Sequence, residues 1–280
     1  MPKISVIGIC GNSVFMSVDS FHKSGETVVA KDCFDEIGGK GINQAIAAAR
    51  MGAEVSFLAA IGDDADGEKC KAAAAQNGIN AYFAVSPGKR TTFAFILTDK
   101  NGENRVTEYV GAELGEEDVL SFEDQIAGSD ILLLQQEVPC DVNEMAVAIA
   151  ERHGVKVILN PAPIRPIPAS IAEKVYLVTP NKHEKEGIKH LDFKNCITTL
   201  GKEGCNINGN DFVKALEVNA VDTTGAGDTF NGVLAVCLAE GMDMKRACQY
   251  AVAGSGISVT RHGVLASIPM RDEIERMVNQ

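Results

Sequence analysis

The chain alternates between short apolar runs and longer segments in which apolar residues recur every three or four positions. A short apolar run bounded by glycine or polar residues is typical of a buried strand, and the longer periodic pattern is typical of a helix. Strands that are apolar throughout and alternate with helices indicate a parallel sheet covered on both faces, so we expect an α/β fold. The expected strands are 3–9, 55–60, 131–134, 156–159 and 175–178, and the expected helices are 45–51, 66–76, 143–153, 169–174, 226–240, 243–257 and 272–278.

Residues 12–36 and 91–110 do not follow this rhythm. In the first segment Val28 and Val29 are the only clear strand residues, whereas the second holds two strand-like runs joined by Asp99-Lys100-Asn101-Gly102, which is a hairpin signal. We expect the two segments to form a small β-sheet that acts as a lid over the carboxyl edge of the main sheet, where α/β folds bind ligands. The whole chain, 1–280, would then be a single domain with the lid inserted in it.

Composition and charge exclude several classes of function. The chain has 280 residues and a formal net charge of -12, and no basic stripe offsets this excess, which argues against nucleic-acid binding. No apolar run is long enough to span a bilayer, and the first residues lead straight into a strand, so we expect neither a membrane segment nor a signal peptide. The eight cysteines are scattered without a Cys-x-x-Cys pair and are interpreted as reduced thiols, which favours a cytoplasmic protein.

A glycine-containing turn at 222–232 carries the strongest chemical signal. The run 215–221 alternates like a strand and a long apolar helix follows the turn, so Gly225 and Gly227 are expected between a strand and a helix N-terminus. Free backbone N–H groups and the positive end of the helix dipole attract a phosphate or a developing oxyanion there. Asp228 lies within this cluster of donors and can accept a proton, although it could also be an ordinary helix N-cap.

A second glycine cluster, Gly38-Gly39-Lys40-Gly41-Ile42-Asn43-Gln44, precedes the helix that ends at Met51. Its glycines let the backbone approach a ligand closely, and Asn43 offers a donor and an acceptor for paired hydroxyls. Alone, such a cluster is more often only a tight turn. Lys40 is not a P-loop lysine, and no Gly-x-Gly-x-x-Gly follows the first strand, so the usual mononucleotide and dinucleotide fingerprints are both missing.

Taken together, the two glycine segments resemble the signatures of the PfkB family of carbohydrate kinases, and within it the ribokinase type. Residues 38–45 match the first signature and Asp222-Thr223-Thr224-Gly225-Ala226-Gly227-Asp228-Thr229-Phe230 matches the second. Shorter matching pieces occur in the family's order along nearly the whole chain. They are Gly25-Glu26-Thr27, Asn160-Pro161-Ala162-Pro163, Thr179-Pro180-Asn181-x-x-Glu184, Leu200-Gly201-x-x-Gly204 and Val259-Thr260-Arg261-x-Gly263.

The resemblance implies a three-layer αβα fold with a β-sheet lid, and phosphoryl transfer from ATP to a hydroxymethyl group of a sugar. It assigns Asp228 as the catalytic base and the turn 225–227 (Gly225, Ala226 and Gly227) as the anion hole. Phosphoryl transfer depends mainly on positioning and charge neutralisation, which such a turn supplies. The implied sugar contacts are Gly39, Lys40, Asn43, Glu137 and Asp228, and the implied ATP contacts are Asn181, Thr199, Gly201, Gly204, Gly225 and Gly227.

The resemblance also implies two kinds of metal ion. Glu184, with Asn181, matches an element associated with Mg²⁺, which it would hold through water; without that context, Asn181-x-x-Glu184 is more typical of a helix capping box, and both interpretations can hold. A monovalent cation, K⁺, would be bound mainly by backbone carbonyls. The matching positions for that ion are Asp222, Thr224, Ser258, Arg261, Gly263 and Ser267.

Sugar recognition departs from the ribokinase pattern. That pattern has Gly-Ser-x-Asn-x-Asp after the first strand, and counting from Gly11 places Val14 and Met16 at the Asn and Asp positions. The segment up to Gly25 then looks three residues shorter, so Asp19 becomes a candidate for the missing carboxylate, with Met16 as a candidate contact. Unpaired sugar hydroxyls would cost about 1–3 kcal/mol each, which disfavours D-ribose. The stretch 182–198 is also shortened, which bears on nucleotide binding.

Two other functions stay open beside the sugar kinase. Nucleoside kinases share this fold, and Phe15 with Met16 offers a surface for a base. A non-catalytic sugar sensor is the other alternative, although the complete turn with Asp228 argues against it. We also expect a homodimer, because a lid made of 12–36 and 91–110 leaves strand edges that can pair with a second lid.

Overall fold

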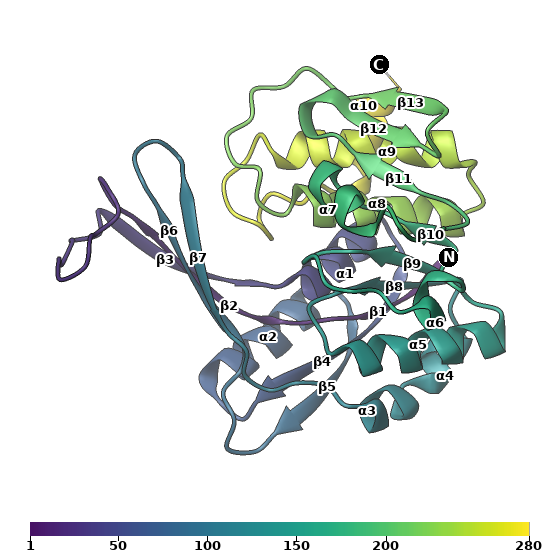
Figure 1. Ribbon diagram of the computed structural model, residues 1–280, viewed down its shortest axis with the longest axis horizontal. Coiled ribbons are helices and arrows are strands. Elements are labelled where there is room, and N and C mark those ends of the chain that lie inside the picture. The colour runs from purple at the N-terminus through teal and green to yellow at the C-terminus, as the bar shows by residue number, and fades with distance from the viewer. Residues whose placement is uncertain (280) are drawn as a thin grey trace.

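The computed structural model describes residues 1–279, and its centre is a parallel β-sheet (Figure 1). Within that range the strand order is β10-β9-β8-β1-β4-β5, and every registered pair is parallel, as the apolar strands predicted. The strands are β1 (Lys3–Ile7), β4 (Glu54–Gly62), β5 (Asn80–Ser86), β8 (Ile131–Gln135), β9 (Lys156–Asn160) and the short β10 (Leu177–Val178).

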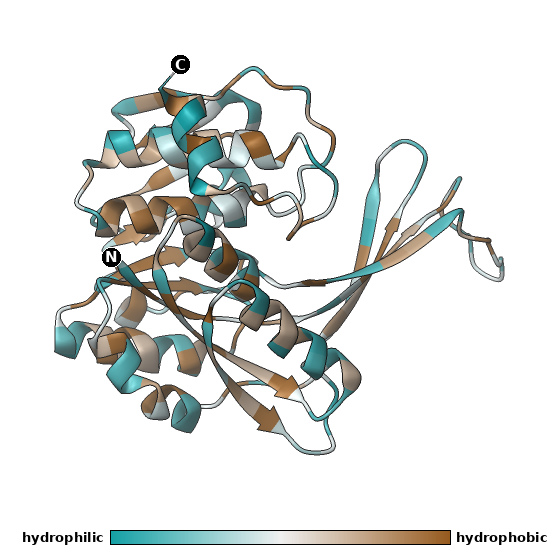
Figure 2. Ribbon diagram, turned by 180° about the vertical axis from the view of Figure 1, so that it is seen from behind, coloured by the Kyte–Doolittle hydropathy of each residue, from teal (hydrophilic) through white to brown (hydrophobic). Residues whose placement is uncertain are grey.

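Helices cover both faces of this sheet and give the expected three layers (Figure 1). Successive residues of β1 serve opposite cores, since Val6 packs with one helical layer and Ile7 with the other. The sheet strands are mostly apolar, and the helices carry polar residues on their outer sides (Figure 2). One layer holds α1 (Lys40–Arg50), α2 (Ala65–Gln76), α8 (Ala226–Ala239), α9 (Met244–Ser258) and α10 (Arg271–Val278), and the other holds α3 (Glu116–Ser121), α4 (Glu123–Ala127), α5 (Cys140–His153) and α6 (Ala169–Ala172). No helix in 1–279 has both the length and the hydropathy that a membrane crossing requires.

The lid is a separate sheet that stands away from the main body, with strand order β3-β2-β6-β7 (Figure 1). Two antiparallel hairpins, β2–β3 and β6–β7, are joined by a parallel pairing of β2 with β6. The lid is confirmed, but the expectation that Val28 and Val29 form its first strand is wrong. Both lie in the loop between β2 and β3, and Val29 is 87% exposed. The strands are β2 (Gly11–Ser17), β3 (Asp32–Gly38), β6 (Phe93–Thr98) and β7 (Asn104–Tyr109).

A third, antiparallel sheet follows α7 (Lys182–Ile188) and was not predicted. It consists of β11 (Ile197–Thr199), β12 (Gly204–Ile207) and β13 (Asp211–Lys214), with the 3-10 turn η1 (Gly201–Glu203) between its first two strands. The predicted strand at 215–221 is wrong, because the chain runs from β13 to α8 without sheet pairing. Its apolar residues Leu216 and Val218 line a cavity instead. This accounts for the alternation of apolar and polar residues that is otherwise typical of a strand.

Helices α1 and α8 approach each other at Gly232. A Cβ on that glycine would lie 2.5 Å from Ala47 Cβ and 2.6 Å from the Gln44 carbonyl oxygen. Only a residue without a side chain allows this separation, which brings the first turns of the two helices together at the carboxyl ends of the strands.

We predict that Gly232→Ala lowers the free energy of unfolding by about 1–3 kcal/mol, because the added methyl overpacks the α1–α8 contact. Gly256→Ala in α9 is the matched control, since its Cβ would meet only Leu216 at 3.6 Å and alanine favours a helix. Urea unfolding measures both changes. Equal stability of the two variants would contradict the close approach at Gly232.

Candidate active site

The N-terminus of α8 forms a turn whose backbone donors point out of the helix. Gly225 is the N-cap with a φ of 74°, and Val264 packs against it so closely that a Cβ there would lie 2.6 Å from Val264 Cγ1. The Ala226 N–H donates to the Thr223 carbonyl oxygen at 3.3 Å. The first-turn N–H groups of Gly227 and Asp228 have no acceptor inside a helix, so they form an anion-binding group at the positive end of the dipole.

Asp228 is held by two side-chain amides from the start of α1. Its Oδ2 accepts from Asn43 Nδ2 at 2.9 Å, and its Oδ1 accepts from Gln44 Nε2 at 3.0 Å. Asp228 is 6% exposed and Gln44 is fully buried. Both partners donate, so each carboxylate oxygen keeps a lone pair for a further donor. The sequence analysis placed Gln44 inside the first glycine signature but gave it no role, and its only signal was its position beside Asn43.

A buried polar network continues from Gln44 to the ends of the sheet strands. Gln44 Oε1 accepts from Gln135 Nε2 at 2.8 Å, and Gln44 Nε2 also lies 3.3 Å from Asn160 Oδ1. Thr179 donates to Asn231 Oδ1 at 2.6 Å, and Asn231 Nδ2 donates to the Gly227 carbonyl oxygen. Strand ends and both helices therefore fix the orientation of the Asp228 carboxylate.

A cavity of about 300 Å³ lies between the lid and the turn. Gly39, Lys40, Asn43, Glu137 and Asp228 all line it, so the structure brings the predicted sugar contacts together. Among residues 1–279 the buried Asn43 Oδ1 has no hydrogen-bond partner, which leaves an acceptor in the cavity wall. From the lid the cavity receives Ser13, Phe15, Phe93, Ala94, Ile96, Asn104, Val106 and Glu108.

Lys40 and Glu137 form a charged pair in this cavity. Glu137 Oε2 accepts from the Lys40 backbone N–H at 2.8 Å, and its Oε1 lies 4.0 Å from Lys40 Nζ. Burial raises the pKa of Glu137 to about 7, with Lys40 opposing the shift and Asp228 adding to it. The pKa of Lys40 is raised above its ordinary value, chiefly by the charge of Asp228.

Met16 and Asp19, the two candidate replacements for the sugar-binding residues, do not line this cavity, and neither does Val14 at the altered Asn position. Val14 and Met16 project from the face of β2 opposite Ser13 and Phe15, because side chains alternate along a strand. Asp19 lies past the end of β2, is 69% exposed and forms an ion pair with Lys31. The expectation that these positions supply the sugar contacts is therefore wrong.

The error lies in the glycine from which the pattern was counted. Gly8 directly follows β1, and counting Gly-Ser-x-Asn-x-Asp from it places Gly11 and Ser13 at the Asn and Asp positions. Both residues line the cavity. The shift of three residues also removes the apparent shortening before Gly25.

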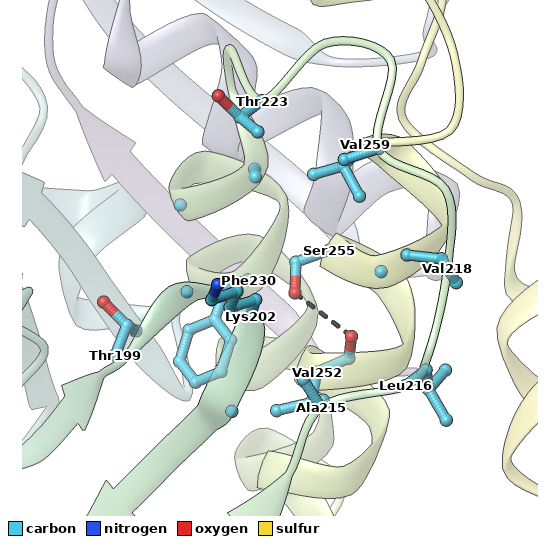
Figure 3. Close-up of a pocket in the computed structure, with 16 residues that line it drawn as sticks. Thr199, Lys202, Ala215, Leu216, Val218, Thr223, Phe230, Val252, Ser255 and Val259 are labelled. Carbon is cyan, nitrogen blue, oxygen red and sulfur yellow. Dashed lines mark hydrogen bonds between the residues drawn. The ribbon is translucent and has the colours of Figure 1, made fainter.

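A second cavity of about 330 Å³ lies on the other side of the turn (Figure 3). Of the predicted ATP contacts, Thr199, Gly201, Gly204 and Gly227 line it, whereas Gly225 lines the first cavity and Asn181 lines neither. Figure 3 shows Ser255 turned toward the Val252 carbonyl oxygen, to which its hydroxyl donates at 3.1 Å. The apolar lining was missed from the sequence and consists of Ala215, Leu216, Val218, Ala220, Phe230, Val252 and Val259.

Asn181 and Glu184 form the capping box of α7. Glu184 accepts from the Asn181 backbone N–H at 2.8 Å and from Asn181 Nδ2 at 2.7 Å, while Asn181 Oδ1 accepts from the Glu184 N–H. Burial raises the pKa of Glu184, against hydrogen bonds from Asn181 and the charge of Lys40. Across the described chain no cluster of three or more His, Cys, Asp or Glu side chains could hold a metal ion. The single carboxylate fits a Mg²⁺ ion held mostly by water and phosphate oxygens.

The two loops that were expected to surround a monovalent cation lie against each other behind the turn. The N–H groups of Val221 and Asp222 donate to the Val259 carbonyl oxygen, and Asp222 accepts from the N–H groups of Thr224 and Gly263. The remaining side chains of the set are used locally, since Arg261 pairs with Glu273 and the hydroxyls of Ser258 and Ser267 donate to backbone carbonyls. Backbone carbonyls are thus the donor atoms that fit this ion.

Glu36 connects the lid to the loop at 264–266, a contact that the sequence did not predict. Its carboxylate accepts from the backbone N–H groups of Val264 at 2.8 Å, Leu265 at 2.7 Å and Ala266 at 3.3 Å. Because Val264 also packs on Gly225, the base of β3 is connected to the anion-binding turn. The contact joins residues more than two hundred positions apart, and no local pattern signals it.

The anion-binding turn carries a carboxylate and separates two cavities. This arrangement on an α/β fold is typical of an enzyme that transfers a group between two substrates. The family model for pfkB family carbohydrate kinases matches residues 1–271, and the chain belongs to that family. It is an ATP-dependent carbohydrate kinase.

Known relatives match over the full length. The ribokinase of Haemophilus influenzae is 37% identical over 294 residues, which cover 96% of each chain. The crystal structure of a ribokinase from Thermotoga maritima superposes with a TM-score of 0.89 at 34% identity, covering 100% of both chains. An Arabidopsis thaliana ribokinase solved with ribose and ATP has a TM-score of 0.88 at 25% identity, covering 100% of this chain and 99% of that one.

We predict that Glu137 makes stability fall as the pH rises toward neutrality. A carboxyl whose native pKa is raised to about 7 binds its proton more tightly in the folded state, so its contribution is complete in acid and is lost as the pH passes 7. Relative to Glu137→Gln, which stays neutral, the wild type should lose about 3 kcal/mol between about pH 4 and pH 8. Urea unfolding across this range measures the difference, and parallel profiles for the two proteins would contradict the raised pKa.

Proposed function

We propose that the chain transfers the γ-phosphoryl group of ATP to a hydroxymethyl group of a sugar bound under the lid. One observation carries this assignment, namely that the N-terminus of α8 is a wall between the two cavities. Ala226 and Gly227 line the cavity of Figure 3, whereas Gly225 and Asp228 line the cavity under the lid. A phosphoryl group that enters from one side therefore meets the acceptor hydroxyl at the same turn.

In this proposal Asp228 is the general base. Asn43 and Gln44 hold its two oxygens, and a free lone pair accepts the proton of the sugar hydroxyl as it attacks the phosphorus. The free N–H groups of the turn meet the charge that develops on the transferred phosphoryl oxygens. The positions of these N–H groups are set before the reaction, because Gly225 packs closely against Val264 and α8 packs closely against α1.

The proposal includes two ions that the donor sets fit. Glu184 would hold Mg²⁺ through water, and the carbonyls around Asp222 and Gly263 would hold K⁺ behind the turn. When bound, these cations neutralise phosphate charge and strengthen the positive end of the turn.

The acceptor is a sugar other than D-ribose in this proposal. Gly11 and Ser13 replace the amide and the carboxylate of the ribokinase pattern, so two hydroxyl partners are missing from the β2 side of the cavity. Nucleosides are the second candidate acceptors, because Phe15 lines the cavity and offers a ring face to a base. The ribokinase solved with ribose and ATP supports the placement of a sugar and a nucleotide at this turn.

We predict that Asp228→Asn lowers kcat by at least about a thousandfold, because the variant keeps the shape of the side chain but cannot take the proton. Calorimetry should show ATP binding close to that of the wild type. A coupled ADP-release assay with a panel of sugars and nucleosides measures turnover. Near wild-type turnover in Asp228→Asn would remove the base assignment, and phosphorylation of nucleosides alone would replace the sugar by a nucleoside.

We also propose a homodimer formed through the lids. The edge strands β3 and β7 have free sides, and large apolar side chains on the lid are exposed, among them Phe34, Phe95 and Val106. Exposed strand edges with apolar residues are suited to pairing with a second copy.

We predict a dimer in sedimentation velocity at micromolar concentration, and dissociation to monomers in Phe95→Lys, which places a charge on the exposed lid face that points away from the sugar cavity. Leu120→Lys is the control, because Leu120 is 47% exposed but lies on α3, outside the lid. A wild-type protein that sediments as a monomer, or a dimer that survives Phe95→Lys unchanged, would count against the lid interface.

A further inference from the structure

One carboxylate in the sugar cavity has no part in the proposed reaction. Glu108 lies on β7, the outer strand of the lid, and lines the cavity together with Asn104 and Val106 from the same strand. These residues share one face of β7, because side chains two positions apart point the same way. Glu108 pairs across the lid with Ala94, which also lines the cavity.

Strand β2 lies in the same sheet, separated from β7 by β6, and its residues Gly11 and Ser13 offer little that could replace Glu108. Gly11 cannot carry a side chain, since a Cβ there would lie 2.3 Å from the Thr92 carbonyl oxygen. Ser13 contributes a single short hydroxyl, and the two residues stand where the ribokinase pattern has an amide and a carboxylate. The polar acceptor has therefore moved across the lid sheet from β2 to β7, where Glu108 lies in the same cross-strand row as Ser13 and Ala94.

The charges around the cavity are unbalanced. Asp228, Glu137 and Glu108 line it with carboxylates, whereas Lys40 is the one ammonium among the described lining residues. The Lys40 charge is already shared by Glu137 and Asp228, the first of which lies 4.0 Å away. An anionic substrate would meet net repulsion here, and a protonated amine would be attracted.

We propose that Glu108 is the specificity-determining residue of the cavity and that it accepts a hydrogen bond from a hydroxyl or a protonated amine of the sugar. The acceptors are thus neutral sugars or amino sugars, and sugar acids and sugar phosphates are rejected. The inference rests on the proposed function, because it requires a sugar in this cavity. Glu108 is exposed in the free lid, and its charge becomes effective when the lid and the sugar exclude water.

Kinetics with Glu108→Leu and Glu108→Gln test this assignment. Losing a charged acceptor for a sugar donor corresponds to about a tenfold to hundredfold rise in the sugar KM, with the KM for ATP unchanged. Glu108→Gln should retain most activity toward a neutral sugar and lose more toward its amino analogue, because the amide keeps an acceptor but not the charge. Glu103→Gln is the matched control, since Glu103 is exposed in the hairpin turn and does not line the cavity.

A charge reversal tests the rejection of anions. Glu108→Lys should lower the KM for a sugar phosphate or a sugar acid at least about tenfold relative to the wild type. Thermal unfolding of each variant establishes that it is folded, and calorimetric titration of the sugar without ATP gives a binding readout independent of turnover.

The outcomes separate this inference from the proposed function. If the wild type phosphorylates no sugar and binds none, the proposed function fails. If the wild type phosphorylates a neutral sugar but Glu108→Leu keeps its sugar KM, or if sugar phosphates are accepted as readily as neutral sugars, the inference about Glu108 fails alone.

Discussion

The hydrogen bonds from Asn43 and Gln44 to the Asp228 carboxylate are the contacts on which the rest of the site depends. They form only because α1 and α8 touch at Gly232 and because Gly41 packs on Gly8, where an added Cβ would lie 2.7 Å from the neighbouring glycine. A methyl group at Gly41 or Gly232 would collide with backbone atoms of the facing segment, so it would displace a helix. The chemistry of a small carboxylate is thus fixed by backbone contacts in the centre of the fold.

The lid is connected to the same centre through Glu36. Three backbone N–H groups on one carboxylate make a stiff contact, because charge-assisted hydrogen bonds are stronger than neutral ones. Glu36 therefore links β3 to Val264, which lies both in the cavity wall and against Gly225. A continuous chain of contacts thus connects the base of the lid with the anion-binding turn.

The sequence predicted those parts of the molecule in which burial controls the pattern. β8 and the second half of α8 are mainly apolar, and the Asp228 turn carries a signature that is contained in one short stretch of sequence. The bounds of β2 and β3 could not be predicted, because exposed lid strands carry polar residues on both faces, as Asp35 and Glu36 do. The alternation of apolar and polar residues around Leu216 and Val218 predicted a strand. These side chains line a cavity instead, and a cavity wall can require the same alternation as a sheet. The contacts of Gln44 and Glu36 were out of reach, since each joins segments that only the fold brings together.

The turn at the N-terminus of α8 and the lid part of the cavity wall differ in how they are built. The turn consists of backbone groups and a buried network, whereas the lid part consists of side chains on exposed strands. The free donors of the turn are backbone N–H groups, which only a proline substitution removes, and the Asp228 carboxylate is fixed by a buried network. On the exposed strands of the lid, by contrast, Ser13 and Glu108 can change without disturbing either core. A lid of exposed strands therefore lets the acceptor sugar vary while the phosphoryl transfer site stays constant. The shift of a carboxylate from β2 to β7 that we propose is one such variation, and it leaves the Asp228 turn unchanged.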